Sequence, residues 1–594
     1  MKIQFKHELK PEDKLTNEQV VTLLLKSRHI KNLDEFLNPP SPLNFSLKDF
    51  GLYEKSFEKV LKILKSIKGK NQTIVIYTDY DADGITGGAI LWETLYLLGF
   101  KVMPYVPHRK LEGYGFSKKG IDNVKKQFNP ALIISVDHGI TKVEEIEYAV
   151  SLGIKIIVTD HHLKGEKIPK KAEAIFHIPV LSGSGVAYFF AKEIFSSFSN
   201  NVTMKQFNNE LLGFNFKTDY LALATIGTVA DLVSLIGPSR SVVKYGLEAF
   251  KKIKRVGLKQ IIKESGIENK DITPYDIGFI IAPRINAIGR LEHAIDALRL
   301  LCTNDVKRAE KLAKHIGLTN KDRQNLVEKS VYEARLTIIR GAKLANFYST
   351  TFVDEVKNKQ DFLKLVGNKN LTVRDLPKVI ILVSDHWHEG IIGLIASKIA
   401  EEFYRPTLVL TKTNDHYKGS ARSIPSFHIT EFLRSFKKYL IDVGGHKQAA
   451  GFTIEAKNLN LFTTAVTNKS EKIIKDKDLE RKIKADLKIP LSKIDLSLVK
   501  SLGQLAPFGI GNPQPIFLSE GVIINAQLFG KTNNHLKIFI KDNDSLPLEL
   551  IAFNQSNQFS KLSRGNKINI VYTLEIDRWN EKERLRGRLK QIFS

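Results

Sequence analysis

Apolar and polar positions alternate between residues 73 and 162 in the order expected of strand–helix–strand units. The run TIVIY at 73–77 predicts a buried strand, and TGGAILWETLYLL at 86–98 predicts the helix that follows it. Further strands are expected between helices, at residues 102–106, 131–136 and 155–159. Strands that are joined through helices pair in parallel, so we predict a mostly parallel sheet.

A long charged stretch follows this first region. Asn304 can cap a helix that reaches about Ile339, and we expect this helix to connect two domains. Residues 341–376 show no clean periodicity and are predicted to form an insertion. A second α/β unit opens with VIILV at 379–383 and ends near Ile454.

The C-terminal part is rich in predicted strands. From Pro515 onward, short strands are expected at residues 521–527, 535–541 and 568–576. Short strands at this spacing favour a small barrel. For 594 residues we expect several domains, and we divide the chain into five segments: 1–50, 51–303, 304–376, 377–470 and 471–594.

Composition narrows the class of protein. With 43% hydrophobic and 26% charged residues the chain is globular, and no window approaches the eighteen consecutive apolar residues that span a bilayer. The N-terminus lacks the apolar core of a secretory signal. The single cysteine, Cys302, permits no internal disulfide and no cysteine-based zinc site. We therefore expect a cytoplasmic protein without membrane association.

The net charge of +26 indicates a polyanionic partner. A Lys-rich bias spread evenly over the surface would give the same total, and charge alone does not separate nucleic acid from an anionic membrane. Nucleic-acid binding of this kind weakens steeply with salt, because each neutralised phosphate releases counterions.

Three of the predicted strands run directly into loops that contain aspartate. These loops hold Asp79, Asp137 and Asp160, and ligands of parallel sheets collect at this edge. The first loop, DYDADG at 79–84, could be an ordinary solvated turn. A calcium-binding EF-hand loop is excluded, because it would need Glu where the chain has Ile90.

Together the loops bring several carboxylates and the histidines of Asp160-His161-His162 to one sheet edge. Unpaired buried charges are costly unless a cation neutralises them. Oxygen-rich ligation with one histidine per ion favours Mn²⁺ or Mg²⁺, and the number of ligands suggests two ions. Such a pair is suited to the hydrolysis of phosphodiesters, because it stabilises both the attacking and the leaving oxygen.

Ten motifs then occur in an order that resembles the DHH phosphoesterase family over residues 40 to 594. They are DYDADG at 79–84, EGYG at 112–115, VDHG at 136–139, DHH at 160–162, VADLV at 229–233, PRINAIGR at 283–290, WHEGIIG at 387–393, GSARS at 419–423, GGHKQAAGF at 444–452 and LAPFGIGNPQPIF at 505–517. The resemblance implies a two-lobed DHH/DHHA1 α/β core with a mostly parallel sheet and a C-terminal β-barrel of the OB-fold type.

By this resemblance, six residues are expected to hold the metal pair: Asp79, Asp81, Asp83, Asp137, His161 and Asp231. Asp137 is the expected bridge between the ions. Asp231 follows from the resemblance alone, since by itself it would pass for an aspartate near a helix end. His162 is expected either to support the ligands from behind or to face the substrate, and not to bind the metal itself; no ligand role is assigned to His138.

The resemblance also implies the residues that contact the substrate. Phosphate contacts are expected from one short segment, at Arg284, Asn286 and Arg290. A pocket for a terminal 5′-phosphate is expected from Arg109, Ser420 and Arg422, and His446 is expected to donate to a phosphate. The expected catalytic residues are Asp137, His161, His162 and Arg290.

In the terms of this family, residues 51–303 are the catalytic DHH domain, 377–470 the substrate-binding DHHA1 domain and 471–594 the OB-fold domain. Residues 1–50 are an N-terminal extension, and 304–376 hold the connecting helix and the insertion. In the barrel, six residues are candidates for binding unpaired strands: Phe508, Phe529, Lys531, His535, Lys537 and Phe539. Alternating Phe in a small barrel is more often part of the core.

The implied function is a single-stranded-DNA-specific 5′-to-3′ exonuclease of DNA repair and recombination that uses two Mn²⁺ or Mg²⁺ ions. The implied partners are single-stranded DNA with a 5′-phosphate, a single-strand-binding protein and a helicase. Two alternatives stay open: a phosphodiesterase of short oligonucleotides or cyclic dinucleotides, and a catalytically silent replication scaffold. The net charge and the C-terminal domain argue against the first, and the complete set of expected ligands against the second.

Overall fold

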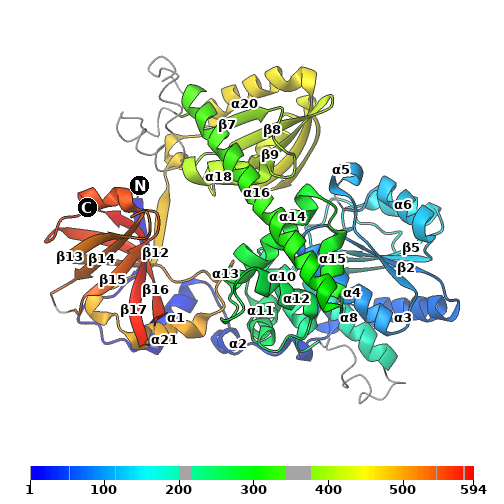
Figure 1. Cartoon of the computed structure of the whole chain (residues 1–594), viewed down its shortest axis with the longest axis horizontal. Helices are drawn as coiled ribbons and strands as arrows, with labels where there is room; N and C mark the ends of the chain where they lie inside the picture. Colours follow the sequence, from blue (N-terminus) through cyan, green and yellow to red (C-terminus); the bar gives the residue numbers. More distant parts are fainter. Residues whose placement is uncertain are drawn as a thin grey trace.

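A computed structural model shows the chain as three packed units, two of them joined by a long helix (Figure 1). It describes residues 2–52, 54–113, 115–199, 216–341, 376–543, 545–579 and 582–593. Nearly all of the insertion expected at 341–376 lies outside these residues, as does the centre of the EGYG motif. None of the helices in these ranges combines the length and the apolar character needed to span a membrane.

The first unit is built on a five-stranded sheet whose neighbouring strands are all parallel, as the sequence predicts. The strand order is β3 (Val102–Tyr105), β2 (Ile74–Thr78), β4 (Leu132–Val136), β5 (Lys155–Asp160) and β6 (Ala174–His177). The four strands expected in this unit lie within about a residue of their predicted bounds. The expected mostly parallel α/β core is confirmed.

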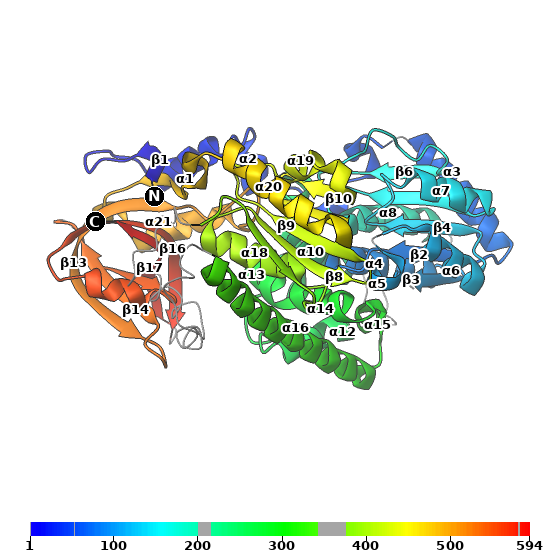
Figure 2. The same cartoon turned by 90° about the horizontal axis from the view of Figure 1, so that it is seen from above.

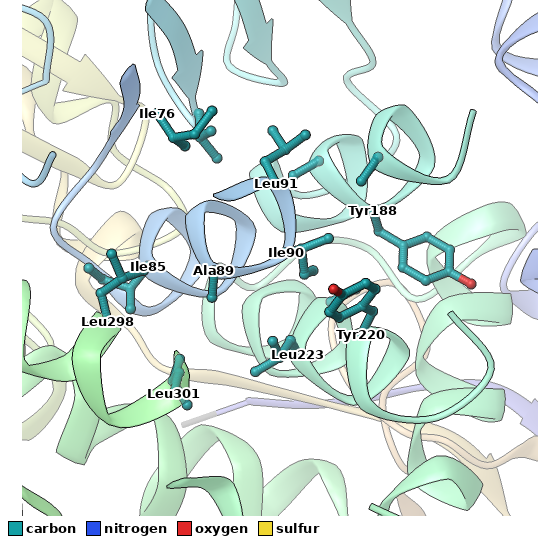
Figure 3. Close-up of a cluster of buried hydrophobic side chains, with 14 of the residues drawn as sticks. Ile76, Ile85, Ala89, Ile90, Leu91, Tyr188, Tyr220, Leu223, Leu298 and Leu301 are labelled. Atoms are coloured by element: carbon teal, nitrogen blue, oxygen red, sulfur yellow. The ribbon is translucent and has the colours of Figure 1, made fainter. Parts of the chain in front are cut away.

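Helices cover both faces of this sheet because the strands are apolar on both sides. Ile74 and Ile76 of β2 point into a core shared with the helices α4 (Ala82–Leu97), α8 (Gly183–Ser199) and α10 (Asp219–Ala230). Val75 and Tyr77 point to the opposite face, which is covered by the helices α6 (Lys118–Phe128) and α7 (Val143–Ser151). Figure 3 shows part of the first core, with Ile76 above α4 and Tyr220 from α10 on its other side.

Helix α4 begins at Ala82, four residues earlier than expected. Asp81 caps it, because one carboxylate oxygen accepts hydrogen bonds from the backbone N–H groups of Asp83 and Gly84, each at 3.0 Å. Half of the DYDADG motif is therefore the first turn of a helix and not a loop.

The rest of the first unit is helical. Its remaining helices are α3 (Glu54–Gly69), α5 (Arg109–Glu112), α11 (Gly237–Phe250), α12 (Val256–Glu264), α13 (Pro274–Asp276), the π-helical turn η3 (Ile277–Ile281), α14 (Ala282–Leu291) and α15 (Ile295–Cys302). The connector is α16 (Val306–Gly341). Asp305, not the expected Asn304, caps it: its carboxylate accepts from the Arg308 N–H at 3.1 Å.

The second unit is a five-stranded sheet in the order β10 (Leu440–His446), β11 (Ala449–Glu455), β9 (His416–Arg422), β8 (Thr407–Thr413) and β7 (Ile380–Ser384). Strands β7 and β8 are parallel, and the other neighbours are antiparallel. The helix α18 (Ile392–Phe403) packs between this sheet and α16. The helices α19 (Ile429–Arg434) and α20 (Leu459–Ile473) contribute to the core on the other face.

The third unit is the expected C-terminal barrel. Strand β13 (Phe517–Phe529) pairs with both β14 (His535–Lys541) and β16 (Lys567–Trp579), and β15 (Leu548–Ala552) and β17 (Lys582–Phe593) complete the ring. Strand β12 (Lys482–Lys488) runs parallel to the start of β13. A closed five-stranded ring is the architecture of an OB-fold.

The N-terminal extension expected at residues 1–50 is built into this third unit. Strand β1 (Lys2–Glu8) pairs in parallel with β12, residue for residue from Lys2 opposite Lys482. The helix α1 (Asn17–Ser27) shares a core with α21 (Leu496–Leu502) and the barrel, and α2 (Leu33–Leu37) follows it. Figures 1 and 2 show both chain termini on the barrel.

A buried arginine joins the barrel to the first unit. Arg240 of α11 has no exposed surface and donates to the backbone carbonyls of Phe36 at 2.6 Å and Ala506 at 2.7 Å. It also donates to the carbonyls of Leu505 and Pro507, and its guanidinium lies 3.8 Å from the centre of the Phe36 ring. The side chain thus ties together the N-terminal segment, the entry to the barrel and the first unit.

Candidate active site

The candidate site forms where neighbouring strands of the first sheet end. Asp79 follows β2, Asp137 follows β4 and Asp160 ends β5, and these three strands are adjacent and parallel. All three aspartates are buried. The sheet therefore collects their carboxylates at one edge, as the sequence pattern predicts.

His161 lies at the centre of the cluster. Its Nε2 atom is 3.1 Å from a carboxylate oxygen of Asp137, 3.4 Å from one of Asp231 and 3.8 Å from one of Asp83. Among the described residues, three overlapping groups have donor atoms close enough to share a cation: Asp137–His161–His162, Asp83–His161–Asp231 and Asp79–Asp81–Asp137. The structure thus brings together all six residues that were expected as ligands.

Backbone groups of helix α8 hold one of these carboxylates in place. Asp83 accepts hydrogen bonds from the N–H groups of Gly183 at 2.6 Å and Ser184 at 2.9 Å. Both are free donors of a helix N-terminus, which favours negative charge. A Cβ atom at Gly183 would overlap the Asp137 carboxylate. Glycine is needed there because a helix end and a carboxylate share the space.

Asp160 orients the histidines beside it. Its carboxylate accepts from the His161 N–H at 2.7 Å and the Ile140 N–H at 2.8 Å, and it lies 2.8 Å from Nδ1 of His162. Burial raises the pKa of Asp160, but the hydrogen bonds from His162 and Ile140 outweigh it and hold that pKa below its ordinary value. Burial lowers the pKa of His162, yet its bond to Asp160 raises it to about 9.

The crowded carboxylates disfavour their own ionisation. Burial, followed by the charges of Asp83 and Asp81, raises the pKa of Asp137 well above its ordinary value. The same causes raise the pKa of Asp231 to about 8. A bound cation would reverse both shifts, because it favours the ionised form.

A cavity of about 1250 Å³ opens beside this cluster, between the first and second units. Its lining includes Arg109, His162 and Arg290 from the first unit and Ser420, Arg422 and His446 from the second. These residues carry hydrogen-bond donors, and three of them are arginines. A space with such walls suits an anionic ligand.

Three arginines in the walls of the cavity are held in place by contacts with neighbouring residues. The Arg290 guanidinium donates to the Gly390 carbonyl of the second unit at 3.2 Å. Gly390 in turn lies so close to the Arg290 backbone that a Cβ atom there would overlap it. The Arg422 guanidinium donates to the Ser420 hydroxyl at 3.1 Å, and that of Arg109 lies 5.1 Å from the centre of the Tyr80 ring.

Three family models match the chain in succession. They are the N-terminal domain of the DHH family at residues 73–228, the DHHA1 domain at 376–472 and the RecJ OB domain at 485–591. Each falls on one of the three units of the structure. These matches identify a DHH domain, a DHHA1 domain and a RecJ OB domain in this order along the chain.

Several relatives of this chain are named single-stranded-DNA-specific exonuclease RecJ. The Bacillus subtilis protein is 31% identical over 552 residues, which cover 90% of this chain and 64% of that protein. The Haemophilus influenzae protein is 27% identical over 580 residues, which cover 95% of this chain and 94% of the relative. The chain thus spans less than two thirds of the Bacillus protein and nearly all of the Haemophilus protein.

Among solved structures, RecJ from Thermus thermophilus in complex with Mn²⁺ matches all of this chain and 80% of its own, with a TM-score of 0.75 and 25% identity. The Mg²⁺ complex of the same protein matches with a TM-score of 0.69. A further exonuclease RecJ bound to manganese matches 72% of this chain at 29% identity, with a TM-score of 0.55.

The donor set of the DHH site fits such ions. Within the part of the chain that the structure describes, Nε2 of His161 and one Asp137 oxygen are buried without a hydrogen-bond partner. Their separation of 3.1 Å is close to the roughly 3 Å between adjacent ligands of an octahedral ion with bonds of about 2.1 Å. Carboxylates with one imidazole are ligands that Mn²⁺ and Mg²⁺ accept.

Two residues that were expected to contact the substrate, Asn286 and Arg284, are bonded to other parts of the protein. Asn286 accepts from the Ala82 N–H at 2.7 Å, so it supports the start of α4 at the metal cluster. Arg284 is not among the residues that line the cavity. Its guanidinium pairs with Glu264 at 2.7 Å and donates to the Ile280 carbonyl at 2.9 Å.

His138 packs between the rings of Tyr77 and Phe116, at centroid distances of 5.2 and 5.7 Å. Burial lowers the pKa of His138 to about 4, which keeps its ring neutral. It belongs to none of the three candidate metal groups among the described residues.

In the OB domain the six candidates divide between the core and the surface. Phe508 packs against the barrel core. Phe529 and His535 lie on the outer face with their rings 5.1 Å apart, and Lys537 lies 6.0 Å from the Phe529 ring. Phe539 is on the same outward side of β14 as Lys537, because Leu536, Ile538 and Ile540 fill the core side, and Lys531 is exposed.

Sequence reasoning missed the groups that position the ligands. These are the N–H groups of Gly183 and Ser184, which bond to Asp83. Asp160 was singled out, but its role in orienting the histidines was not foreseen, nor was the contact of the Gly390 carbonyl with Arg290. The run Gly-Ser-Gly at 183–185 before an apolar helix was a usable signal, since such helix starts bind anionic groups. Nothing local marks Gly390 as a partner of Arg290.

Proposed function

We propose that this chain is a metal-dependent exonuclease that degrades single-stranded DNA from its 5′ end. The observation that carries the proposal is a cluster of metal-ligating side chains at the wall of a cavity with cationic residues from two units. The names of the relatives support the same activity and the same substrate.

We assign the metal pair to Asp79, Asp81, Asp83, Asp137, His161 and Asp231, with Asp137 between the two ions. Two bound Mn²⁺ or Mg²⁺ ions supply an activated water and neutralise charge on the oxygens of the phosphate under attack. The chain's own part is to hold its carboxylates converging on one point, and the amides of α8 hold Asp83 in this position.

Other residues of the first unit act on the phosphate itself. We assign to Arg290 a hydrogen bond to a non-bridging oxygen, because its guanidinium lines the cavity and already crosses to the second unit. His162 also lines the cavity, and in the metal-free site its hydrogen bond to Asp160 raises its pKa to about 9. Its Nδ1 is engaged by Asp160, so Nε2 is the ring nitrogen left to face the substrate. Asn286 supports the site through its hydrogen bond to the Ala82 backbone. The Arg284 guanidinium pairs with Glu264, so we assign it no contact with the phosphate.

We assign the polarity of degradation to residues of both units. Arg109, Ser420 and Arg422 provide donors within the same cavity and are assigned to a terminal 5′-phosphate. His446, exposed near the β10–β11 turn, is assigned to a phosphate further along the strand. A free 5′ end then lies next to the metal cluster, and each cut releases a mononucleotide.

The wider assignments are part of this proposal. Residues 51–303 form the catalytic domain, 377–470 hold the substrate and 471–594 bind the strand as it leaves the core. A single-strand-binding protein and a helicase would supply the substrate during DNA repair and recombination. The cytoplasmic location expected from the sequence stays a prediction.

The test is degradation of one strand labelled at either end, with and without a 5′-phosphate, in Mn²⁺ and in Mg²⁺. We expect mononucleotides from the 5′ end and slower cutting without the phosphate. Asp81→Ala or His161→Ala should lower the rate on the order of a thousandfold or more. Asp122→Asn, on the outer helix α6, is the matched control and should leave the rate unchanged.

Other outcomes would contradict the proposal. Unchanged cleavage by Asp81→Ala and His161→Ala would place the chemistry elsewhere. Rapid hydrolysis of dinucleotides or cyclic dinucleotides with little action on long strands would identify a short-oligonucleotide phosphodiesterase. Equal cutting of blunt duplex and single strands would refute the strand selectivity.

A further inference from the structure

Two large aromatic side chains of the first unit stand in solvent, stacked on each other. Tyr275 is 61% exposed and Phe279 is 69% exposed. Their ring centroids are 4.7 Å apart and their planes differ by 23°. Folding normally buries such rings, and a contiguous exposed apolar patch marks a binding surface more often than a single exposed residue does. We call these two residues the aromatic pair.

The aromatic pair belongs to the same stretch of helix as the site. The segments α13, η3 and α14 follow one another without a break, and α14 carries Asn286 and Arg290. At a rise of about 1.5 Å per residue, the eleven positions from Phe279 to Arg290 span roughly 16 Å. Any movement of the pair is therefore tied to the residues that contact the proposed substrate.

The pair also adjoins the helix that carries a proposed metal ligand. At Gly278, between the two aromatic residues, an added Cβ atom would lie 3.7 Å from the Val229 side chain of α10. Asp231 is the residue that caps the C-terminus of α10. The next residue, Leu232, is 67% exposed. The apolar surface thus begins directly beside the metal cluster.

From there exposed apolar side chains continue toward the barrel. Ile236 and Ile510 are also exposed, and the Leu235 N–H donates to the Ile510 carbonyl at 2.7 Å. Residue 510 lies in the segment that leads into β13 of the barrel. In Figures 1 and 2, α13 lies on the side of the first unit that faces the barrel. The aromatic pair therefore lies between the cavity and the barrel.

The side of the first unit that carries α13 faces the barrel, so a strand that runs from the cavity toward the barrel along this side would meet this surface. Every nucleobase offers an apolar face of about the size of an aromatic ring, and unpaired bases stack on such rings without sequence preference. A paired base has its faces covered by its neighbours in the duplex. The surface thus favours one occupant, an unpaired strand.

We propose that Tyr275 and Phe279 form a stacking platform for unpaired nucleobases of the strand between the cavity and the barrel. The inference rests on the proposed function and goes beyond it, because it names residues outside the metal cluster, the phosphate contacts and the OB domain. The platform selects single strands by stacking, and it adds affinity only for strands long enough to reach it.

The test uses Tyr275→Ala/Phe279→Ala, with Tyr275→Phe/Phe279→Tyr as the variant that keeps both rings. Tyr96→Ala is the matched control, because Tyr96 is 59% exposed and stacks on Trp92 at 5.3 Å. Tyr96 lies near the C-terminal end of helix α4, and only the first turn of this helix belongs to the proposed site. All these changes are at the surface, so the fold should persist, and melting curves check this.

Binding is measured in chelator with strands of about 16 nucleotides that carry one 2-aminopurine at successive positions from the 5′ end. The fluorescence of this base is quenched when it stacks. In the parent protein we expect the fluorescence to be quenched within a narrow window of positions. The double Ala variant should lose this quenching and bind the strand roughly tenfold more weakly. The variant that keeps both rings and Tyr96→Ala should both retain the quenching. In turnover, the KM of long strands should rise about tenfold, whereas hydrolysis of a dinucleotide should keep both its KM and its kcat.

The failure of this inference can be told from a failure of the proposed function. If the parent protein cuts single strands and the double Ala variant matches it in binding, quenching and KM, the platform is refuted. If the double Ala variant changes the oligomeric state of the protein in solution but not its affinity for DNA, the surface is a contact between copies of the chain. The inference is then also wrong. A parent protein without nuclease activity would refute the proposed function instead.

Discussion

Asp231 connects proton binding to metal binding. In the metal-free site its pKa is raised from 3.8 to about 8, chiefly by burial and then by the charge of Asp83. Between these two pH values the folded protein holds a proton that the unfolded chain has lost. This contribution to stability is complete below pH ~4 and is lost as the pH rises through about 8.

We therefore expect the metal-free protein to lose thermal stability between pH 6 and pH 8.5. Mn²⁺ needs the ionised carboxylate, so the rise in melting temperature that it causes should be larger at pH 8.5 than at pH 6. In Asp231→Asn the side chain stays neutral, which should stabilise the chelated protein at pH 8.5 and reduce the gain from Mn²⁺. Melting curves with chelator or Mn²⁺ at both pH values measure this. The prediction is wrong if Asp231→Asn and the surface control Asp122→Asn respond alike.

At the scale of single residues, the sequence predicted the site residues that lie at the ends of strands. Asp79, Asp137 and Asp160 each follow a recognisable apolar run, and the structure brings them together. Asp231 needed a family resemblance, because it ends a helix of uniformly apolar residues and looks like an ordinary terminus. The surroundings of Arg284 could not be predicted, because Glu264 is twenty positions away on another helix.

The N-terminus of α8 is the element on which the geometry of the metal cluster depends most directly. Gly183→Ala places a methyl group where the Asp137 carboxylate lies, so either the helix or the carboxylate has to move. We expect Mn²⁺ affinity to fall about 10- to 100-fold, as for the loss of other groups that orient ligands. Titration calorimetry with Mn²⁺ measures the effect.

Gly69→Ala is the matched control for this change. Gly69 ends α3, and an added Cβ atom would meet nothing within 4 Å. Both substitutions are from glycine to alanine in a helix, so a general effect of alanine on helix stability would appear in both. Equal Mn²⁺ affinity in the two variants would show that Gly183 has no part in positioning Asp137.

At the scale of elements, the ends of helices and strands were predicted correctly where the apolar pattern determines them. They were missed where a capping side chain determines them. Asp81 starts α4 before its apolar pattern begins, and Asp305 rather than Asn304 starts α16. The pairing of β1 with β12 joins residues 480 positions apart, and short-range patterns contain no trace of it. The N-terminal segment for that reason looked like a separate extension.

For the whole molecule, Arg240 determines how the barrel is attached to the catalytic unit. Arg240→Met should keep much of the contact with Phe36 but leave several buried carbonyls without a donor, at a cost of about 1–3 kcal/mol for each group that stays unsatisfied. We expect earlier proteolysis at the junction and a higher KM for long strands, with dinucleotide hydrolysis unchanged. Limited proteolysis and steady-state kinetics measure these effects.

Arg299→Met provides the comparison for Arg240→Met. Arg299 forms an exposed ion pair with Asp296 in the same unit, and such pairs contribute little to stability. Its removal should change neither proteolysis nor KM. If Arg240→Met behaves in the same way, the attachment of the barrel depends on the surrounding apolar contacts and not on this guanidinium.

The strand β1 lies beside β12, and α1 completes the core that the barrel shares with α21. On the ribosome these first residues therefore emerge several hundred residues before the strand and helix that cover them. The first and second units can fold in that interval, because the strands of each sheet pair within that unit. The order of synthesis thus makes the barrel the last unit to close. Until then the apolar residues of α1 lack the core that buries them in the folded protein.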